Sequence, residues 1–150
     1  MKKISTLCAV ICIFFIQSCK KDPEPSREQL LSAPNGWKIT DESYTSPSQG
    51  AVNIFSYLND CEKDDILKFQ SIGYYNVDEG KTKCSISDPQ TVQAGNWIFD
   101  SSKTVVSIIT SLGPSLGGLS SIYIVTLTKT KLVFKNSTGT SYYTYTYTAL

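Results

Sequence analysis

The chain has 150 residues, with 14 Lys and Arg, 13 Asp and Glu, and no His, which gives a formal net charge of +1. This balance lacks the basic field that nucleic acid binding requires, and the absence of His removes Ser-His-Asp and Cys-His catalysis and most metal hydrolases. We therefore expect no enzyme, no nucleic-acid partner, no cofactor and no metal site.

The first 18 residues have the pattern of an export signal. Lys2 and Lys3 precede an uncharged apolar run over residues 7–16, which is shorter than the about 20 residues that a membrane-spanning helix needs. A cleaved signal peptide over residues 1–18 is therefore expected. The alternatives are an ordinary signal peptide, or a short anchor helix, in which the following cysteine has no role.

The segment Ile16-Gln17-Ser18-Cys19 resembles the lipobox of bacterial lipoproteins. The resemblance implies that Cys19 carries a lipid anchor, that residues 19–26 form a lipidated tether, and that the membrane is a partner of the protein. Lys20 directly after the cysteine implies sorting to the bacterial outer membrane, on its periplasmic face or at the cell surface.

Short elements follow the tether in chain order. Ser26 and Gln29 fit a capping box for a short helix that ends before Pro34. Residues 52–58 place apolar side chains on one helical face and predict a turn or two of helix, and residues 60–65 are acidic and turn-like. Alternating or β-rich runs predict strands over 37–41, 66–70, 74–78, 94–100, 104–110, 121–128, 131–136 and 141–148.

These elements indicate an all-β domain over residues 27–150. Short turns between successive strands favour consecutive antiparallel hairpins. A meander of about eight strands can remove its exposed edges by closing into an up-and-down barrel.

Several short segments follow one another in a recognisable order. They are Leu30-Leu31, Gly36-Trp37-Lys38, 61–65, Phe69, Gly73-Tyr74-Tyr75, Cys84, Gly95-Asn96-Trp97, Tyr123-Ile124-Val125 and Leu132. Their order resembles that of the lipocalin-like lipoprotein domains of Bacteroidetes. The resemblance covers most of residues 28–148 and implies a lipocalin-like antiparallel barrel with an N-terminal helix, without implying a particular activity.

Two of the five cysteines remain for the folded domain. Cys8 and Cys12 leave with the signal and Cys19 is the lipidation site, so Cys61 and Cys84 are expected to pair in an oxidising envelope. Two free thiols, or a two-cysteine metal site completed by carboxylates, are the other interpretations.

Two further features suggest a ligand site. Tyr143, Tyr145 and Tyr147 alternate with threonines and are expected to face into the barrel, as core residues or as the wall of a cavity. Leu112, Leu116 and Leu119 lie in a Gly-rich segment, which either folds onto the domain or acts as a lid or partner contact. The carboxylates of residues 60–65 do not fit a calcium loop and are expected to be solvated.

The leading hypothesis is a lipid-anchored, non-catalytic module that binds a small hydrophobic ligand or an envelope protein partner. The alternative is an accessory subunit of an outer-membrane complex with a packed, ligand-free barrel. A cavity lined by apolar and tyrosine side chains would favour the first, and an exposed apolar patch on a filled barrel would favour the second.

Overall fold

The computed structural model, which describes residues 23–113 and 121–150, contains a closed antiparallel β-barrel. Eight strands follow one another around the barrel in chain order, and β1 (Trp37–Ser46) closes it by pairing with β3 on one side and β9 on the other. A further strand, β2 (Gly50–Asn53), pairs antiparallel with the C-terminal end of β1, residues 43–46. The other strands are β3 (Ile66–Gln70), β4 (Tyr74–Asp78), β5 (Thr91–Phe99), β6 (Val105–Leu112), β7 (Ser121–Leu127), β8 (Lys131–Thr138) and β9 (Ser141–Ala149). The predicted fold class is confirmed.

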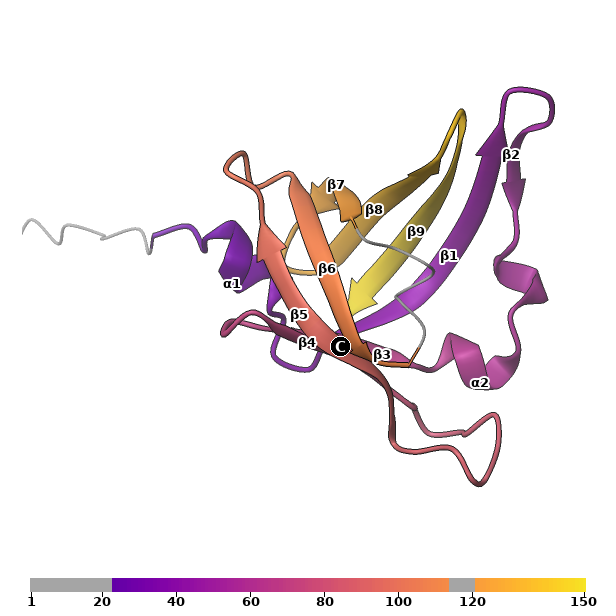
Figure 1. Ribbon diagram of the computed structural model, residues 1–150, viewed down its shortest axis with the longest axis horizontal. Helices are drawn as coiled ribbons and strands as arrows, with labels where there is room; N and C mark the ends of the chain where they lie inside the picture. The colour runs from indigo at the N-terminus through magenta and orange to yellow at the C-terminus, as the bar shows by residue number, and fades with distance from the viewer. Residues whose placement is uncertain (1–22, 114–120) are drawn as a thin grey trace, which may run out of the picture.

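One end of the barrel is covered by the helix α1 (Arg27–Leu31), as Figure 1 shows. The expected capping box is present: Gln29 N donates to Ser26 Oγ at 3.2 Å, and Ser26 N donates to Gln29 Oε1 at 2.7 Å. Leu31 is fully buried, and its carbonyl accepts a hydrogen bond of 2.7 Å from Trp37 Nε1 at the start of β1. Helix and barrel are therefore joined through a buried indole.

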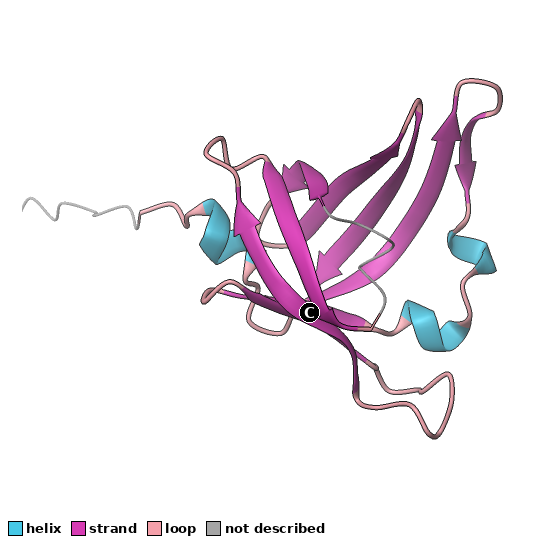
Figure 2. Ribbon diagram, in the orientation of Figure 1, coloured by secondary structure: helices cyan, strands magenta, loops and turns pink. Residues whose placement is uncertain are grey.

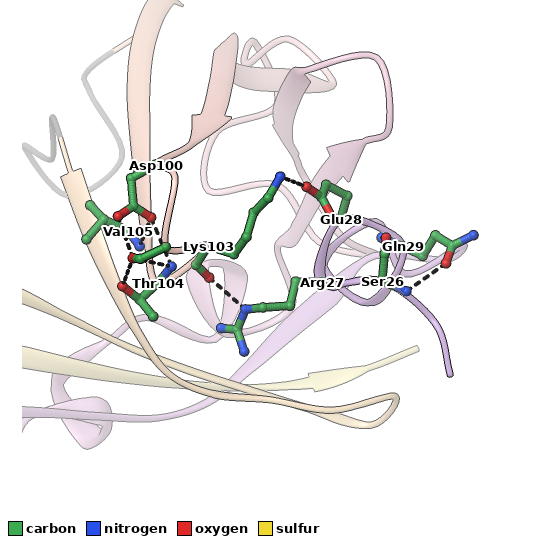
Figure 3. A network of polar contacts seen from close by, with 9 residues as sticks. Ser26, Arg27, Glu28, Gln29, Asp100, Lys103, Thr104 and Val105 are labelled. Atoms are coloured by element: carbon green, nitrogen blue, oxygen red, sulfur yellow. Dashed lines mark hydrogen bonds and ion pairs between the residues drawn. The ribbon is translucent and has the colours of Figure 1, made fainter. Parts of the chain in front are cut away.

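Polar contacts fix the outer side of α1 to the turn between β5 and β6 (Figure 3). Arg27 Nε donates to the Lys103 carbonyl at 2.6 Å, and Lys103 Nζ pairs with the Glu28 carboxylate. Within the turn, the Asp100 carboxylate accepts hydrogen bonds from the Thr104 and Val105 amides, both at 2.9 Å. The turn therefore presents Lys103 to the helix in a fixed position.

Apolar and aromatic side chains fill the half of the barrel next to α1. Phe69, Trp97 and Phe99 meet edge to face at centroid distances of 5.6–5.7 Å, and Phe134 stacks on Tyr147 at 5.5 Å. Such pairs add to the stabilisation from area burial alone. This half of the barrel interior is a packed core.

The opposite end carries the remaining helical turns (Figures 1 and 2). These are the 3-10 turn η1 (Phe55–Tyr57) and the helix α2 (Asp60–Lys63). Cys61 of α2 forms a disulfide with Cys84, with an S–S distance of 2.00 Å, and so joins α2 to the loop 79–90. The predicted pairing is confirmed.

Two local predictions are wrong. Residues 52–58, expected as helix, divide between β2 and η1, because β1 continues to Ser46 and its end pairs with β2. Residues 60–65, expected as a turn, begin with α2, in which Asn59 N donates to Glu62 Oε2 at 2.7 Å as half of a capping box. Strand pairing outweighs the local apolar pattern in residues 52–58, and the cap at Asn59 starts a short helix in residues 60–65.

Candidate functional site

A cavity of about 230 Å³ lies inside the barrel at the α2 end. Its apolar wall comes from residues of β1, β3 and β4 together with Leu58, and its polar wall from carboxylates, an amide and two tyrosines. The lining residues are Ile39, Glu42, Leu58, Glu62, Asp65, Leu67, Val77, Gln93, Tyr145 and Tyr147. At about 30 Å³ per molecule, the volume corresponds to roughly eight waters, or to a small ligand.

A β-bulge in β1 places Glu42 in this cavity. Ile39 pairs with Tyr147, but the register then shifts, so that Asp41 pairs with Thr146 and Glu42 with Tyr145. The extra residue of a bulge reverses the inward and outward alternation along a strand. Without it, the alternation from Ile39 would point Asp41 inward and Glu42 outward.

Two tyrosines of β9, the strand next to β1, line the cavity beside Glu42, and their inward position agrees with the predicted alternation. Tyr147 is 9% exposed and belongs to the core, and Tyr145 packs against that core and stacks near Phe134 at 5.0 Å. Tyr143 continues the row: its ring centroid lies 6.2 Å from that of Tyr145 and 4.9 Å from that of Tyr44. The prediction that this face points inward is confirmed for Tyr145 and Tyr147, while Thr148 on the other face is exposed.

Asp60 and Glu62 of α2 are exposed, as expected, but two carboxylates near them are more buried. Asp65, between α2 and β3, is half-buried, and Glu79, directly after β4, is only 5% exposed. Asp65 Oδ1, Glu79 Oε2 and Gln93 Oε1 are all buried without a hydrogen-bond partner among the residues described. Because a buried polar atom without a partner costs about 1–3 kcal/mol, this end of the barrel is not optimised for stability.

The same crowding changes the acidity of the cavity groups. Burial, together with the nearby Glu79, Asp64 and Glu62, raises the pKa of Asp65 to about 6. Burial and the charge of Glu62 raise the pKa of Glu42, and burial raises the pKa of both Tyr145 and Tyr147. Near neutral pH the cavity therefore holds carboxylates whose ionisation is opposed by their surroundings.

The other predicted site residues lie elsewhere. Leu112 is the last residue of β6, pairs with Ala94 and is 48% exposed, and it does not line the cavity. Leu116 and Leu119, the expected lipidation site Cys19 and the expected signal peptide 1–18 lie outside the described residues. Sequence reasoning identified the tyrosines but missed Glu42, Asp65 and Gln93, because a bulge and burial by distant loops leave no local pattern.

A larger hollow of about 650 Å³ lies on the outer surface beside α1. Its walls include three isoleucines, Ile72, Ile98 and Ile109, which are 82%, 65% and 66% exposed. Lys103 and Glu28 at its edge are already paired with each other. The hollow is an apolar surface feature without a convergent set of polar groups.

Comparison with protein-family models, curated proteins and solved structures found no match. Across residues 23–113 and 121–150, no three His, Cys, Asp or Glu side chains converge closely enough to hold a metal ion. Among the same residues, the helices are too short and too polar to cross a bilayer.

Asp65→Asn should stabilise the domain at pH 8 but not at pH 4. The folded state raises the pKa of Asp65 to about 6, above the about 3.9 of an unfolded chain. Ionisation at neutral pH therefore opposes folding, and stability is lost as the pH rises through this range. Because Asp65 is only half-buried, solvent screens part of this effect. We therefore expect the substitution to raise the free energy of unfolding by about 1 kcal/mol at pH 8, which corresponds to about 4 °C in Tm.

Thermal unfolding of the variant and the wild type at pH 4 and pH 8 measures this effect. Asp60→Asn, which makes the same charge change at a fully exposed side chain, is the matched control. Equal gains for Asp65→Asn at the two pH values would contradict the assignment of the effect to ionisation.

Proposed function

We propose that this protein is a lipid-anchored envelope lipoprotein with a lipocalin-like domain, in which the α2-end cavity binds a small ligand. The observation that carries the proposal is the cavity itself, about 230 Å³ lined by apolar and tyrosine side chains, in a barrel whose other half is packed with aromatic residues. Clefts with a largely apolar wall and a few convergent polar groups are the usual form of small-molecule sites.

The anchor is the second part of the proposal. Cys19, in the lipobox-like segment 16–19, would carry the lipid, and residues 20–26 would join it to α1. Attachment by two or more acyl chains holds a protein at a membrane much more firmly than one chain does. The outer membrane is the proposed location, on its periplasmic face or at the cell surface.

One observation favours a second candidate, an accessory subunit of an outer-membrane complex. Ile72, Ile98 and Ile109 expose apolar surface around the outer hollow beside α1, and exposed apolar patches commonly mark protein interfaces. The cavity and its unpartnered polar atoms have no role in this alternative, which is why we place it second.

The Cys19→Ala variant tests both parts of the proposal in one preparation. Expressed in its own envelope, the variant should move from the membrane fraction to the soluble fraction and should lose labelling by a fatty acid. Native mass spectrometry of the soluble form should then show a retained mass beyond that of the polypeptide.

A second substitution assigns the retained mass to the cavity. Tyr145→Ala should remove the mass from the Cys19→Ala form, because Tyr145 lines the cavity. Thr146→Ala, on the next residue and the other face of β9, should leave it in place. Labelling that persists in Cys19→Ala would overturn the anchor. A folded Tyr145→Ala form that keeps the mass would overturn the cavity as the site.

A further inference from the structure

We infer that the ligand of the α2-end cavity is a small organic cation, such as a protonated amine with an apolar portion. This inference rests on the proposed binding function and adds the chemical class of the ligand. It follows from the charge, the unpartnered polar atoms and the aromatic surfaces of the cavity.

The charge of the cavity has one sign. Glu42 from β1, Glu62 from α2 and Asp65 at the start of β3 all line it, and neither Lys nor Arg is among the described lining residues. The buried carboxylate of Glu79 acts on Asp65 from beyond the wall. Glu62 is exposed, whereas Glu42 and Asp65 are half-buried, and Asp65 Oδ1 is buried. Burying a carboxylate even partly without a cation is costly, so a positively charged occupant beside Asp65 and Glu42 would relieve a cost that the protein already bears.

The three lining carboxylates differ in how far their oxygens are already engaged. Glu62 Oε2 already accepts hydrogen bonds from Asn59 N at 2.7 Å and Asn59 Nδ2 at 2.9 Å. In contrast, Asp65 Oδ1 is buried without a partner, and the Glu42 carboxylate makes no hydrogen bond to any described residue. A protonated amine supplies N–H donors for such oxygens.

The tyrosines make the site more than an acidic cluster. Tyr147 lines the cavity and is only 9% exposed. Its hydroxyl makes no hydrogen bond within the described chain. Tyr147, Glu42 and Asp65 line the same cavity, and burial together with Tyr145, Glu42 and Asp65 raises the pKa of the Tyr147 hydroxyl. An aromatic ring beside carboxylates suits an organic cation, whose charge is attracted to the ring face.

The shape of the site favours an organic cation over a metal ion. The carboxylates come from three separate elements, and no three acidic side chains among the described residues converge on one point. Ile39, Leu67 and Val77 line the remaining wall and would contact apolar atoms of the ligand. A molecule with a charged group and a short apolar part matches both walls.

The pH dependence of binding follows from the groups around Asp65. The charges of Glu79, of Asp64 and of Glu62 act on Asp65, and the charge of Asp65 in turn acts on the Tyr147 hydroxyl of β9. With the pKa of Asp65 raised to about 6, the ionised fraction falls from about 97% at pH 7.5 to about 9% at pH 5. Affinity for a cation should therefore fall by about tenfold over this range.

The experiment is an NMR titration of the full chain carrying Cys19→Ala with three probes of one shape. These are phenethylamine as the cation, 2-phenylethanol as its neutral analogue and phenylacetate as an anion. At pH 7.5 the amine should bind about tenfold more tightly than the alcohol, with shifts at Glu42, Tyr145 and Tyr147. At pH 5 this preference should largely disappear, and phenylacetate should bind weakest at pH 7.5.

Two variants make the outcome decisive. Glu42→Gln should reduce the preference for the amine several-fold while leaving binding of the alcohol unchanged, and Asp60→Asn, which removes an exposed charge, should leave both unchanged. If the alcohol binds as tightly as the amine, the cation inference is wrong while the cavity remains a binding site. If none of the three probes shifts the cavity residues, both the cation inference and the proposed ligand-binding function of the cavity are overturned.

Discussion

Trp37→Ala should lower the free energy of unfolding by about 3–5 kcal/mol, the range for removing a large buried aromatic side chain. Trp37 is completely buried and pairs with Leu67 of β3 on one side and Ala149 of β9 on the other. Its indole also donates the 2.7 Å hydrogen bond to the Leu31 carbonyl. Truncation would leave a cavity, leave that carbonyl unpaired and release α1 from the end of the barrel.

Urea unfolding followed by circular dichroism measures this loss, and Trp37→Phe separates its two causes. Phenylalanine keeps most of the apolar contact but cannot donate the hydrogen bond, so its cost should be about 1–2 kcal/mol. Ile98→Ala, at a side chain that is 65% exposed, is the control and should change stability by less than about 0.5 kcal/mol. A loss below about 1 kcal/mol for Trp37→Ala would show that α1 does not depend on the indole.

Local patterns in the sequence were sufficient for most of the barrel. The bounds predicted for β3 and β4 agree with the structure, and those of β7 differ by one residue. These strands are short, rich in apolar and β-branched or aromatic residues, and bounded by turn residues, so local signals are enough to locate them. The end of β1 and strand β2 were missed because each is stabilised mainly by its partner.

The cavity was only half predictable, for a related reason. The regular Tyr-Thr alternation correctly placed Tyr145 and Tyr147 inside. The position of Glu42 depends on the bulge after Ile39, and the burial of Asp65 depends on the loop 79–90 folding back over it. Both are long-range effects, which a pattern in neighbouring residues does not contain.

The contacts that hold the loop 79–90 near Asp65 are the disulfide and a set of hydrogen bonds to its neighbour Asp64. The Asp64 carboxylate accepts from the Lys81 amide at 2.8 Å and from the Thr82 amide and hydroxyl at 3.0 Å. Gly80 lies so close that an added Cβ would be 2.0 Å from the Asp64 carbonyl oxygen. The loop 79–90 is therefore attached to the α2 region in two ways, covalently through the disulfide and through the hydrogen bonds of Asp64.

Replacing Cys61 and Cys84 together by Ser should lower the free energy of unfolding by about 3 kcal/mol. The bond spans 23 residues, and in the chain-entropy model a loop of this size restricts the unfolded chain by about that amount. The four-residue helix α2 is far too short to form alone, so the loss should also move Glu62 and lower affinity for a ligand in the cavity. Urea unfolding of the double variant and of wild type with reductant should agree, because both lack the same bond.

The hydrogen bonds of Asp64 should keep the loop partly in place, so Asp64→Ala added to the double variant should cost more than Asp64→Ala in the disulfide-bonded protein. If the two costs are equal, the covalent and polar attachments act independently, and the loop is not held by them jointly.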